Sequence, residues 1–422
     1  MIRSSRSTQR LTGTIFRHSI TSRKRSILPQ KIMGRTRTKS KLQRQVPPKT
    51  SATESSGSSS SPSTTPSISA LISKAQSIIE QCDYDLASQF IRRILQKSPK
   101  NAEAREMLGV VQLETGLVQE ARETFETLVP PHPDAPSTPK YTSHLHLAQL
   151  SDEDPHLALR HYQSALDILT AQNKGKERAV GSNSDPDLDA DVKGTIVRVL
   201  ISMVEIWMDP SYDLCFDPAA EQTCERLIRL ALETDENNVE ALQTLASVRL
   251  SQQRPDEARE CVERAWNGWK DLDLDDPKVP SIPARLSLVK LFLELSLFNP
   301  ALITLQGIMA SDDQEVEAWY LEGWAFYLMA ELAHDSPNGK LEGEGLTWEE
   351  LAKDARDCLE TCKNLHVAQE HADGPILEHV NELIGSLEAK GVRPTPDDER
   401  DDGGWEDVEA DSEDDDEDVE MS

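Results

Sequence analysis

A period of 34 residues limits the folds open to this chain more than any other feature of its sequence. Small residues and prolines repeat with this step early in the chain: Ala75, Ala87 and Pro99 precede Gly109, Ala121 and Pro133. The same step recurs further along, where Cys224, Ile228 and Ala231 precede Ala258, Val262 and Ala265. Such a period is typical of helical hairpins, each of which buries its apolar face only by stacking on the next.

The second of these units resembles the tetratricopeptide repeat at the positions that set helix packing: Leu108, Gly109, Gly116, Ala121, Phe125 and Pro133. Trp319, Gly323 and Phe326 match the first-helix positions of a later unit. Small residues let the two helices of a hairpin approach closely, and large residues fill the groove between them. The resemblance implies an all-α fold in which about seven hairpins and a capping helix form one solenoid over residues 68–390.

The two ends of the chain differ from this body in composition. Residues 1–67 start with a basic stretch and continue into a run of Ser, Thr and Pro, whereas residues 391–422 carry a dense acidic run. Neither composition can bury a core, so we expect both ends to be disordered. Two polar stretches inside the body, 173–194 and 334–347, are predicted to be loops between helices.

The first 32 residues allow two interpretations. They are rich in Arg and Ser and lack acidic residues, which is the composition of a mitochondrial presequence. Alternatively, Met33 opens the basic stretch "MGRTRTKSKLQRQ" and resembles a natural start, so that residues 1–32 would be upstream sequence. We favour the second interpretation because the remainder of the chain does not resemble a mitochondrial protein.

The distribution of charge indicates the kind of partner that the body can bind. The chain has a net charge of −29, and residues 1–53 carry +14 while residues 397–422 carry −15, so the part between them carries −28. Such a body repels nucleic acid and favours a basic partner. No apolar run approaches the length of about 20 residues that spans a bilayer, so no membrane association is expected.

The cysteines and histidines give little sign of catalytic or metal chemistry. Six scattered cysteines without a secretory signal indicate a reducing compartment, either the cytoplasm or the nucleus. Cys358 and Cys362 share one helix face near His366, but buried core thiols explain them better than a zinc site does. Since no nucleophile elbow, phosphate-binding loop or HExxH motif is present, we expect neither an enzyme nor a cofactor.

A binding surface is predicted from the repeat register, because the first helices of tetratricopeptide hairpins line the concave face. Positions 2, 5, 9 and 12 of three such helices select twelve residues: Glu103, Glu106, Val110 and Leu113; Glu240, Gln243, Ser247 and Leu250; Glu317, Tyr320, Trp324 and Tyr327. Carboxylates combined with exposed aromatic rings suit a peptide rich in Lys and Arg. The alternative is that the acids form a solvated face and the rings pack against a neighbouring helix.

The same register separates the aromatic residues of the stretch 317–331 into two sets. Trp319 and Phe326 are predicted to face the core on either side of Gly323, and the other rings are predicted to face the groove. The carboxylates of this groove would also repel the acidic peptide tails that one subgroup of tetratricopeptide domains binds with Lys, Arg and Asn.

Three stretches resemble the fungal assembly chaperones of large-subunit ribosomal protein L-four: "EVEAWYLEGWAFYLM", "LAKDARDCLETCKNLH" and "HVNELIGSLEAKG", the last followed by "GWEDVEADSEDDDED". Residues 1–32 have no counterpart in this resemblance, and Glu322 stands where the repeat expects Leu. The resemblance implies a monomeric chaperone that binds this basic ribosomal protein, shields its basic loop and escorts it to nuclear pre-ribosomes. It also implies a nuclear import receptor as a further partner.

A second function remains open. The chain could serve as a general tetratricopeptide scaffold or adaptor, in mitochondria or elsewhere, with no ribosomal client. Recovery of the bound partner would distinguish the two functions.

Overall fold

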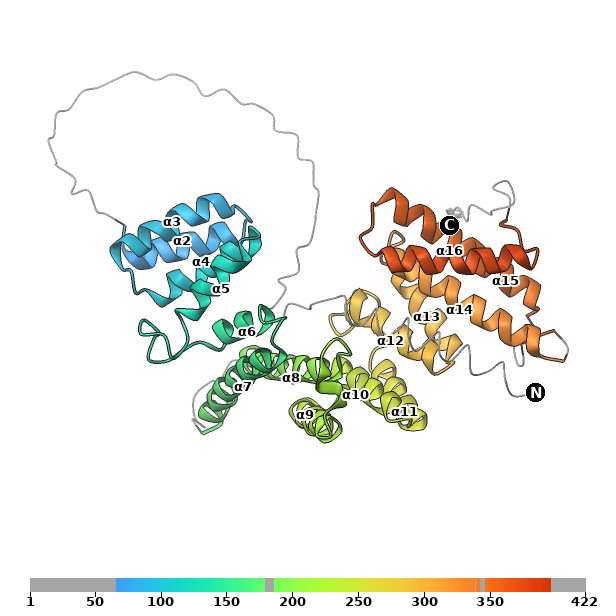
Figure 1. Cartoon of the computed structure of the whole chain (residues 1–422), viewed down its shortest axis with the longest axis horizontal. Helices are drawn as coiled ribbons and strands as arrows, with labels where there is room; N and C mark the ends of the chain where they lie inside the picture. The colour runs from blue at the N-terminus through green and yellow to red at the C-terminus, as the bar shows by residue number, and fades with distance from the viewer. Residues whose placement is uncertain (1–65, 179–185, 338, 342–345, 396–422) are drawn as a thin grey trace, which may run out of the picture. The chain divides into compact units, whose positions relative to one another are not determined.

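The computed structural model describes residues 66–178, 186–337, 339–341 and 346–395 (Figure 1). Within these residues the chain forms fifteen α-helices and a short 3-10 helix, and its only β-type pairing is an isolated bridge between Lys340 and Thr347. The all-α prediction is confirmed. The predictions of disorder fall almost entirely on residues 1–65 and 396–422, which lie outside the described residues.

The chain divides into two compact units, the first of which ends at Gly268. Its helices pair in chain order into five hairpins: α2 (Ile68–Ile79) with α3 (Tyr84–Lys97), α4 (Ala102–Glu114) with α5 (Val118–Glu126), α6 (Tyr141–Gln149) with α7 (Pro155–Arg178), α8 (Pro186–Met208) with α9 (Ala220–Thr234), and α10 (Val239–Ser251) with α11 (Pro255–Asn267). The 3-10 helix η1 (Asp213–Phe216) lies between α8 and α9.

The second unit begins at Trp269 and contains two hairpins and a final helix. The pairs are α12 (Ile282–Glu294) with α13 (Phe298–Met309), and α14 (Val316–Asp335) with α15 (Trp348–Ala368); α16 (Gly374–Ala389) packs against α14 and α15. Seven hairpins and a capping helix therefore match the predicted number and order. One continuous domain over residues 68–390 stays a prediction.

Local sequence signals explain where these helices begin. The side chain of Asn101 accepts a hydrogen bond from the amide of Ala104 at 2.7 Å, and Asn238 repeats this arrangement at the start of α10. Thr347 and Glu350 form a reciprocal capping box at the start of α15. Each cap satisfies an amide that the first turn of a helix leaves without a partner.

Small residues at the predicted positions bring the paired helices together. Ala75, Ala87 and Ala121 are fully buried. A methyl group added at Gly109 would lie 2.6 Å from the ring of Phe125, on the second helix of the same hairpin. Because carbon atoms cannot approach so closely, glycine at this position allows the aromatic ring to fill the space between α4 and α5.

The loop predicted over residues 173–194 is wrong in its bounds. Helix α7 continues to Arg178 and α8 begins at Pro186, so most of this stretch is helical. Residues 173–178 are mainly Lys, Glu and Arg, which are good helix formers, and Pro is tolerated in the first turn of a helix. The second predicted loop, 334–347, agrees with the structure to within two residues, since α14 ends at Asp335 and α15 begins at Trp348.

Replacement of Gly323 tests the close approach of α14 and α15. An added methyl would lie 2.8 Å from Cγ of Leu359 and 3.2 Å from its backbone nitrogen, so we expect Gly323→Ala to destabilise the protein by about 1–3 kcal/mol. The matched control is Gly385→Ala in α16, where an added methyl meets nothing within 4 Å and should stabilise the helix by up to about 1 kcal/mol. Urea unfolding measures both, and equal midpoints would contradict the packing argument.

Candidate functional site

Two of the predicted binding carboxylates lie on one face of α4 and reach the first helices of the neighbouring hairpins. Glu103 accepts a hydrogen bond from the side-chain amide of Gln76 in α2 at 3.0 Å. Glu106 forms an ion pair with Lys140, at the start of α6, with an N–O distance of 2.7 Å, and accepts a hydrogen bond from the hydroxyl of Thr142. The shared face agrees with the predicted register, and a role in partner binding stays a prediction.

The ion pair between Glu106 and Lys140 is accessible to solvent on the lysine side. Partial burial opposes the charge of Lys140, but the hydrogen bond and charge of Glu106 outweigh it and raise the pKa of the ammonium group. The Lys140 side chain is 57% exposed and that of Glu106 is 16% exposed, so water screens the pair mainly from the lysine side. A cationic side chain from a partner could therefore replace Lys140 at Glu106 at little cost.

The other predicted residues of α4 are apolar and belong partly to the core. Val110 and Leu113 are half-buried and pack against a cluster that includes residues of α5 and α6: Ala121, Phe125, Leu128, Val129 and Leu147. The predicted surface on this helix therefore changes from carboxylates near its start to partly covered apolar groups near its end.

The four residues predicted on α10 differ in exposure, and Ser247 and Leu250 are half-buried. Glu240 is half-buried, whereas Gln243 is only 5% exposed. Gln243 thus contributes to packing rather than offering an open surface, contrary to its predicted groove position. The backbone carbonyl groups of Glu240 and Gln243 accept hydrogen bonds from hydroxyl groups one turn later, those of Thr244 and Ser247.

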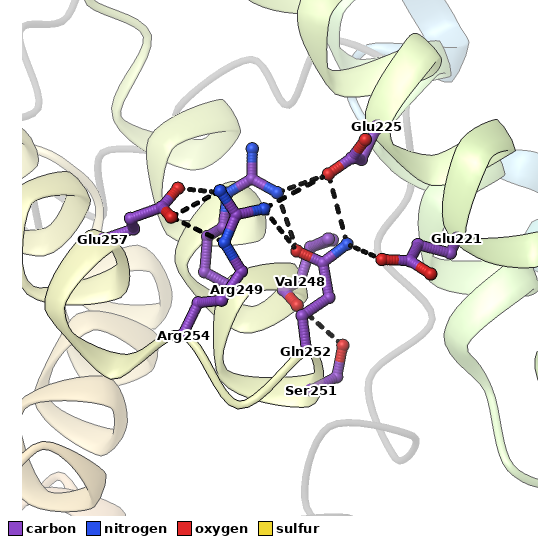
Figure 2. Close-up of polar contacts among 8 residues, drawn as sticks. All are labelled: Glu221, Glu225, Val248, Arg249, Ser251, Gln252, Arg254 and Glu257. Carbon is purple, nitrogen blue, oxygen red and sulfur yellow. Dashed lines mark hydrogen bonds and ion pairs between the residues drawn. The ribbon is translucent and has the colours of Figure 1, made fainter.

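A polar network that the sequence did not predict joins α9, α10 and α11 (Figure 2). Arg249 pairs with Glu225 at 2.5 Å and with Glu257 at 3.2 Å, and Arg254 pairs with the same two carboxylates. The hydrogen bond from Arg249 is the main cause of a lowered pKa of Glu225. Since both guanidinium groups are neutralised by carboxylates, this region does not offer free cations to an acidic peptide.

The groove residues predicted on α14 were expected to be open to solvent, but they are buried or half-buried. Glu317 is 4% exposed and pairs with Lys290 of α12 at 2.5 Å. Tyr320 and Trp324 are 5% and 4% exposed, so the prediction that their rings are exposed is wrong. Their role in partner binding is therefore not supported by their environment.

The capping helix α16 explains this burial. The hydroxyl of Tyr320 lies 2.8 Å from Nδ1 of His379, and the ring of Trp324 meets that imidazole edge-on at 5.5 Å between centroids. Tyr327, which is half-buried, contacts Ser386 through its hydroxyl at 3.0 Å and lies beneath the ammonium group of Lys390. The alternative interpretation, in which the rings pack against a neighbouring helix, is correct for this face.

The two aromatic residues predicted for the core of this hairpin are less buried than Tyr320 and Trp324, which were predicted for the groove. Trp319 and Phe326 are both half-buried, and the indole nitrogen of Trp319 donates to the carbonyl of Asp313 at 2.7 Å. Gly323 faces the second helix as predicted, because α15 passes directly over it at Leu359. The sequence did contain a signal that α16 packs against another surface, namely an apolar stripe along that helix: Ile376, Val380, Leu383, Ile384 and Leu387.

A carboxyl group stands in the core of the second unit where the repeat expects Leu. Glu322 is buried, and this burial raises its pKa to about 7, although a hydrogen bond from the thiol of Cys358 at 3.6 Å works in the opposite direction. Cys362, one turn further along α15, is fully buried. Among the described residues no group of three His, Cys, Asp or Glu side chains could hold a metal ion.

Comparison with known proteins agrees with the observed fold of helical hairpins. Residues 79–138 match the model of the tetratricopeptide repeat family. A protein of Schizosaccharomyces pombe named "Probable assembly chaperone of rpl4" is 32% identical over 317 residues, which cover 75% of this chain and 89% of that protein. Its namesake in Emericella nidulans is 37% identical over 205 residues, covering 46% of this chain and 53% of that protein.

A solved structure titled "Assembly Chaperone of RpL4 (Acl4) (Residues 1-338)" aligns with a TM-score of 0.56 and 29% identity, covering 64% of this chain and 99% of that one. The paired helices and the family match define a tetratricopeptide repeat protein. Within that class, the chain belongs to the family of assembly chaperones of rpl4. None of the helices in the described part of the chain is both long and apolar enough to cross a membrane.

Truncation of Trp324 tests whether its ring is part of the core. Because the ring is buried against α16, we expect Trp324→Ala to lower the free energy of unfolding by about 3–5 kcal/mol. Trp319→Ala on the same helix is the control, and the half-buried position of that ring predicts a smaller loss. Thermal unfolding followed by circular dichroism compares them. If the Trp324→Ala protein had wild-type stability, the result would contradict burial of this ring and favour its predicted position in the groove.

Replacement of Glu322 tests the raised pKa of this buried carboxyl group. Its folded pKa of about 7 exceeds the ordinary value of 4.5, so the stability that depends on protonation is complete below the ordinary value and is lost as the pH rises through 7. Glu322→Gln, which imitates the protonated form, should therefore be about as stable as wild type near pH 4 and more stable near pH 8, by up to about 3 kcal/mol. Urea midpoints at both pH values measure the difference, and Glu378→Gln on the exposed face of α16 should show no such gain.

Proposed function

We propose that this chain is a dedicated chaperone of the ribosomal protein rpl4, and that it binds the newly made protein through its basic loop. The observation that carries the proposal is the family relationship, which extends over 89% of the S. pombe relative, a protein named for assembly of rpl4. On this proposal the chaperone keeps the loop from aggregating and from binding RNA until the client reaches a nuclear pre-ribosome.

The charge of the body supports a basic client. Residues 54–396 carry a net charge of −28, and the partly exposed carboxylates on first helices of the first unit include Glu103, Glu106 and Glu240. A negative surface attracts a basic chain from a distance and speeds its capture. The pair of Glu106 with a solvent-exposed Lys140 supplies a carboxylate at which a client cation can take the place of a lysine.

The cellular setting follows from the same proposal. Capture of a newly made protein and its delivery to pre-ribosomes place the chaperone in both the cytoplasm and the nucleus, acting as a monomer bound to one client. A nuclear import receptor is the additional partner that delivery requires. The scattered cysteines of the chain are consistent with these reducing compartments.

Co-purification tests the proposal directly. Full-length protein carrying an affinity tag should recover rpl4 in nearly equal amount from cells, and the complex should weaken steeply as salt rises because exposed charges are screened. Recovery of several unrelated proteins without rpl4 would favour a general scaffold and contradict the proposal.

Charge removal on the first helices tests where the client binds. We expect the triple substitution Glu103→Gln, Glu106→Gln and Glu240→Gln to weaken binding of rpl4 by about tenfold or more, since carboxylates that pair with client cations are lost. Isothermal titration at low salt measures the affinity. Gln preserves the size of each side chain and its ability to accept a hydrogen bond, so the fold should be retained.

A matched variant removes the same number of charges from exposed positions on second helices: Glu120, Glu126 and Glu263. Its affinity should fall much less, because only the general field of the protein changes. Equal losses of affinity in the two triple variants would show that the client does not bind at Glu103, Glu106 and Glu240.

A further inference from the structure

The chain doubles back after the capping helix and attaches to α15. Gly391 adopts a φ of +84°, and the amide of Val392 donates to the carbonyl of Leu387 at 3.0 Å, a C-terminal cap of the Schellman type. This cap reverses the chain direction. Residues 391–394 then line a small cavity together with Arg356 and Glu388.

Thr395 links the segment 391–395 to the carboxylate of Asp357 through two hydrogen bonds. Its amide donates to Oδ1 of Asp357 at 2.9 Å, and its hydroxyl donates to Oδ2 of the same residue. Both carboxylate oxygens therefore hold one threonine, 38 positions further along the chain. Asp354 lies one turn earlier on α15, and its pKa is raised by burial and then by the charge of Asp357. Asp357 thus has a second carboxyl group near it, while Arg356 and Arg393 line the adjacent cavity.

The sequence around this contact fits a phosphorylation site. Thr395 is followed directly by Pro396, the residue that proline-directed Ser/Thr kinases require, and the acidic run of the C-terminal segment begins immediately afterwards. We propose that Thr395 is a phosphorylation site for such a kinase, and that its phosphorylation releases residues 391–395 from Asp357. The inference does not depend on the identity of the client.

The chemistry of the step accounts for the release. The kinase transfers the γ-phosphoryl group of ATP to Oγ1 of Thr395, ADP leaves, and the hydroxyl proton passes to the catalytic base of the kinase. Oγ1 then has no hydrogen to donate to Asp357, and a phosphate with a charge between about −1.5 and −2 takes its place beside a carboxylate. Arg356 cannot compensate, because its guanidinium group is already paired with Glu360 and Glu388.

The attached and released states also explain how the kinase gains access. While Thr395 is held by Asp357 its hydroxyl is engaged, so the kinase acts on the released state, which the modification then makes dominant. The cap at Gly391 uses only backbone groups of α16 and its end, so it should persist after release. The change is thus confined to the few residues that join α16 to the acidic run.

Hydrogen exchange with mass spectrometry tests both parts of the proposal on the full chain. After incubation with a proline-directed kinase and magnesium ATP, phosphate should be found on Thr395, and the peptide containing its amide should exchange about tenfold faster or more. Absence of phosphate on Thr395 while other Thr-Pro or Ser-Pro sites are modified would overturn the proposal. Phosphorylation without faster exchange would overturn the release.

Two variants complete the test. Thr138, which also precedes a proline and is exposed, is the matched control, and its phosphorylation should leave exchange of the 391–395 segment unchanged. In Asp357→Asn the neighbouring carboxylate charge is gone while an acceptor oxygen remains, so phosphorylation of Thr395 should accelerate exchange by a smaller factor than in wild type. An equal factor in both proteins would show that repulsion by Asp357 is not the cause.

Discussion

Two of the hairpins depend on a contact that only a very small residue permits. At Gly109 the ring of Phe125, and at Gly323 the side chain of Leu359, occupy the space that a methyl group would need. The absence of one carbon on the first helix thus lets a large residue of the second helix reach its surface, and the two helices bury a continuous apolar seam. The matching position of α2 also holds a small buried residue, Ala75, so the sequence carries a regular period even where few individual residues are shared.

Ion pairs also connect the first helices of neighbouring hairpins. Glu106 pairs with Lys140 and Glu317 with Lys290, yet the two pairs differ in environment. The Glu317 side chain is only 6% exposed, so removing Lys290 would take away a cation that balances a buried carboxylate, which is costly. The Lys140 side chain is largely in water and can be exchanged. The two carboxylates therefore differ in setting: Glu317 is enclosed together with its lysine, whereas the lysine that pairs with Glu106 is largely in solvent.

The repeat period identified the hairpins, their order and the small residues between their helices, because these follow from spacing alone. It also placed Tyr320 and Trp324 together on one face of α14, but it did not show what covers that face. The covering surface is α16, whose His379 lies 59 residues from Tyr320 and outside the repeat pattern. Polar composition misled in the stretch 173–194, since a helix and a loop can contain the same polar residue types. The contact of Thr395 with Asp357 likewise follows no period and required the structure.

In the proposed role, these features bear on how a client would be released. Carboxylates such as Glu106 that already have an exposed lysine beside them bind a client cation by exchange, so each site contributes little net energy. Capture then depends on many weak charge contacts summed over an acidic body, and it is sensitive to a competing anion. Ribosomal RNA carries one phosphate per nucleotide and offers a denser negative charge than a protein surface does, so a basic loop would transfer to it spontaneously. A chaperone built from a few tight, buried ion pairs could not give up its client in this way.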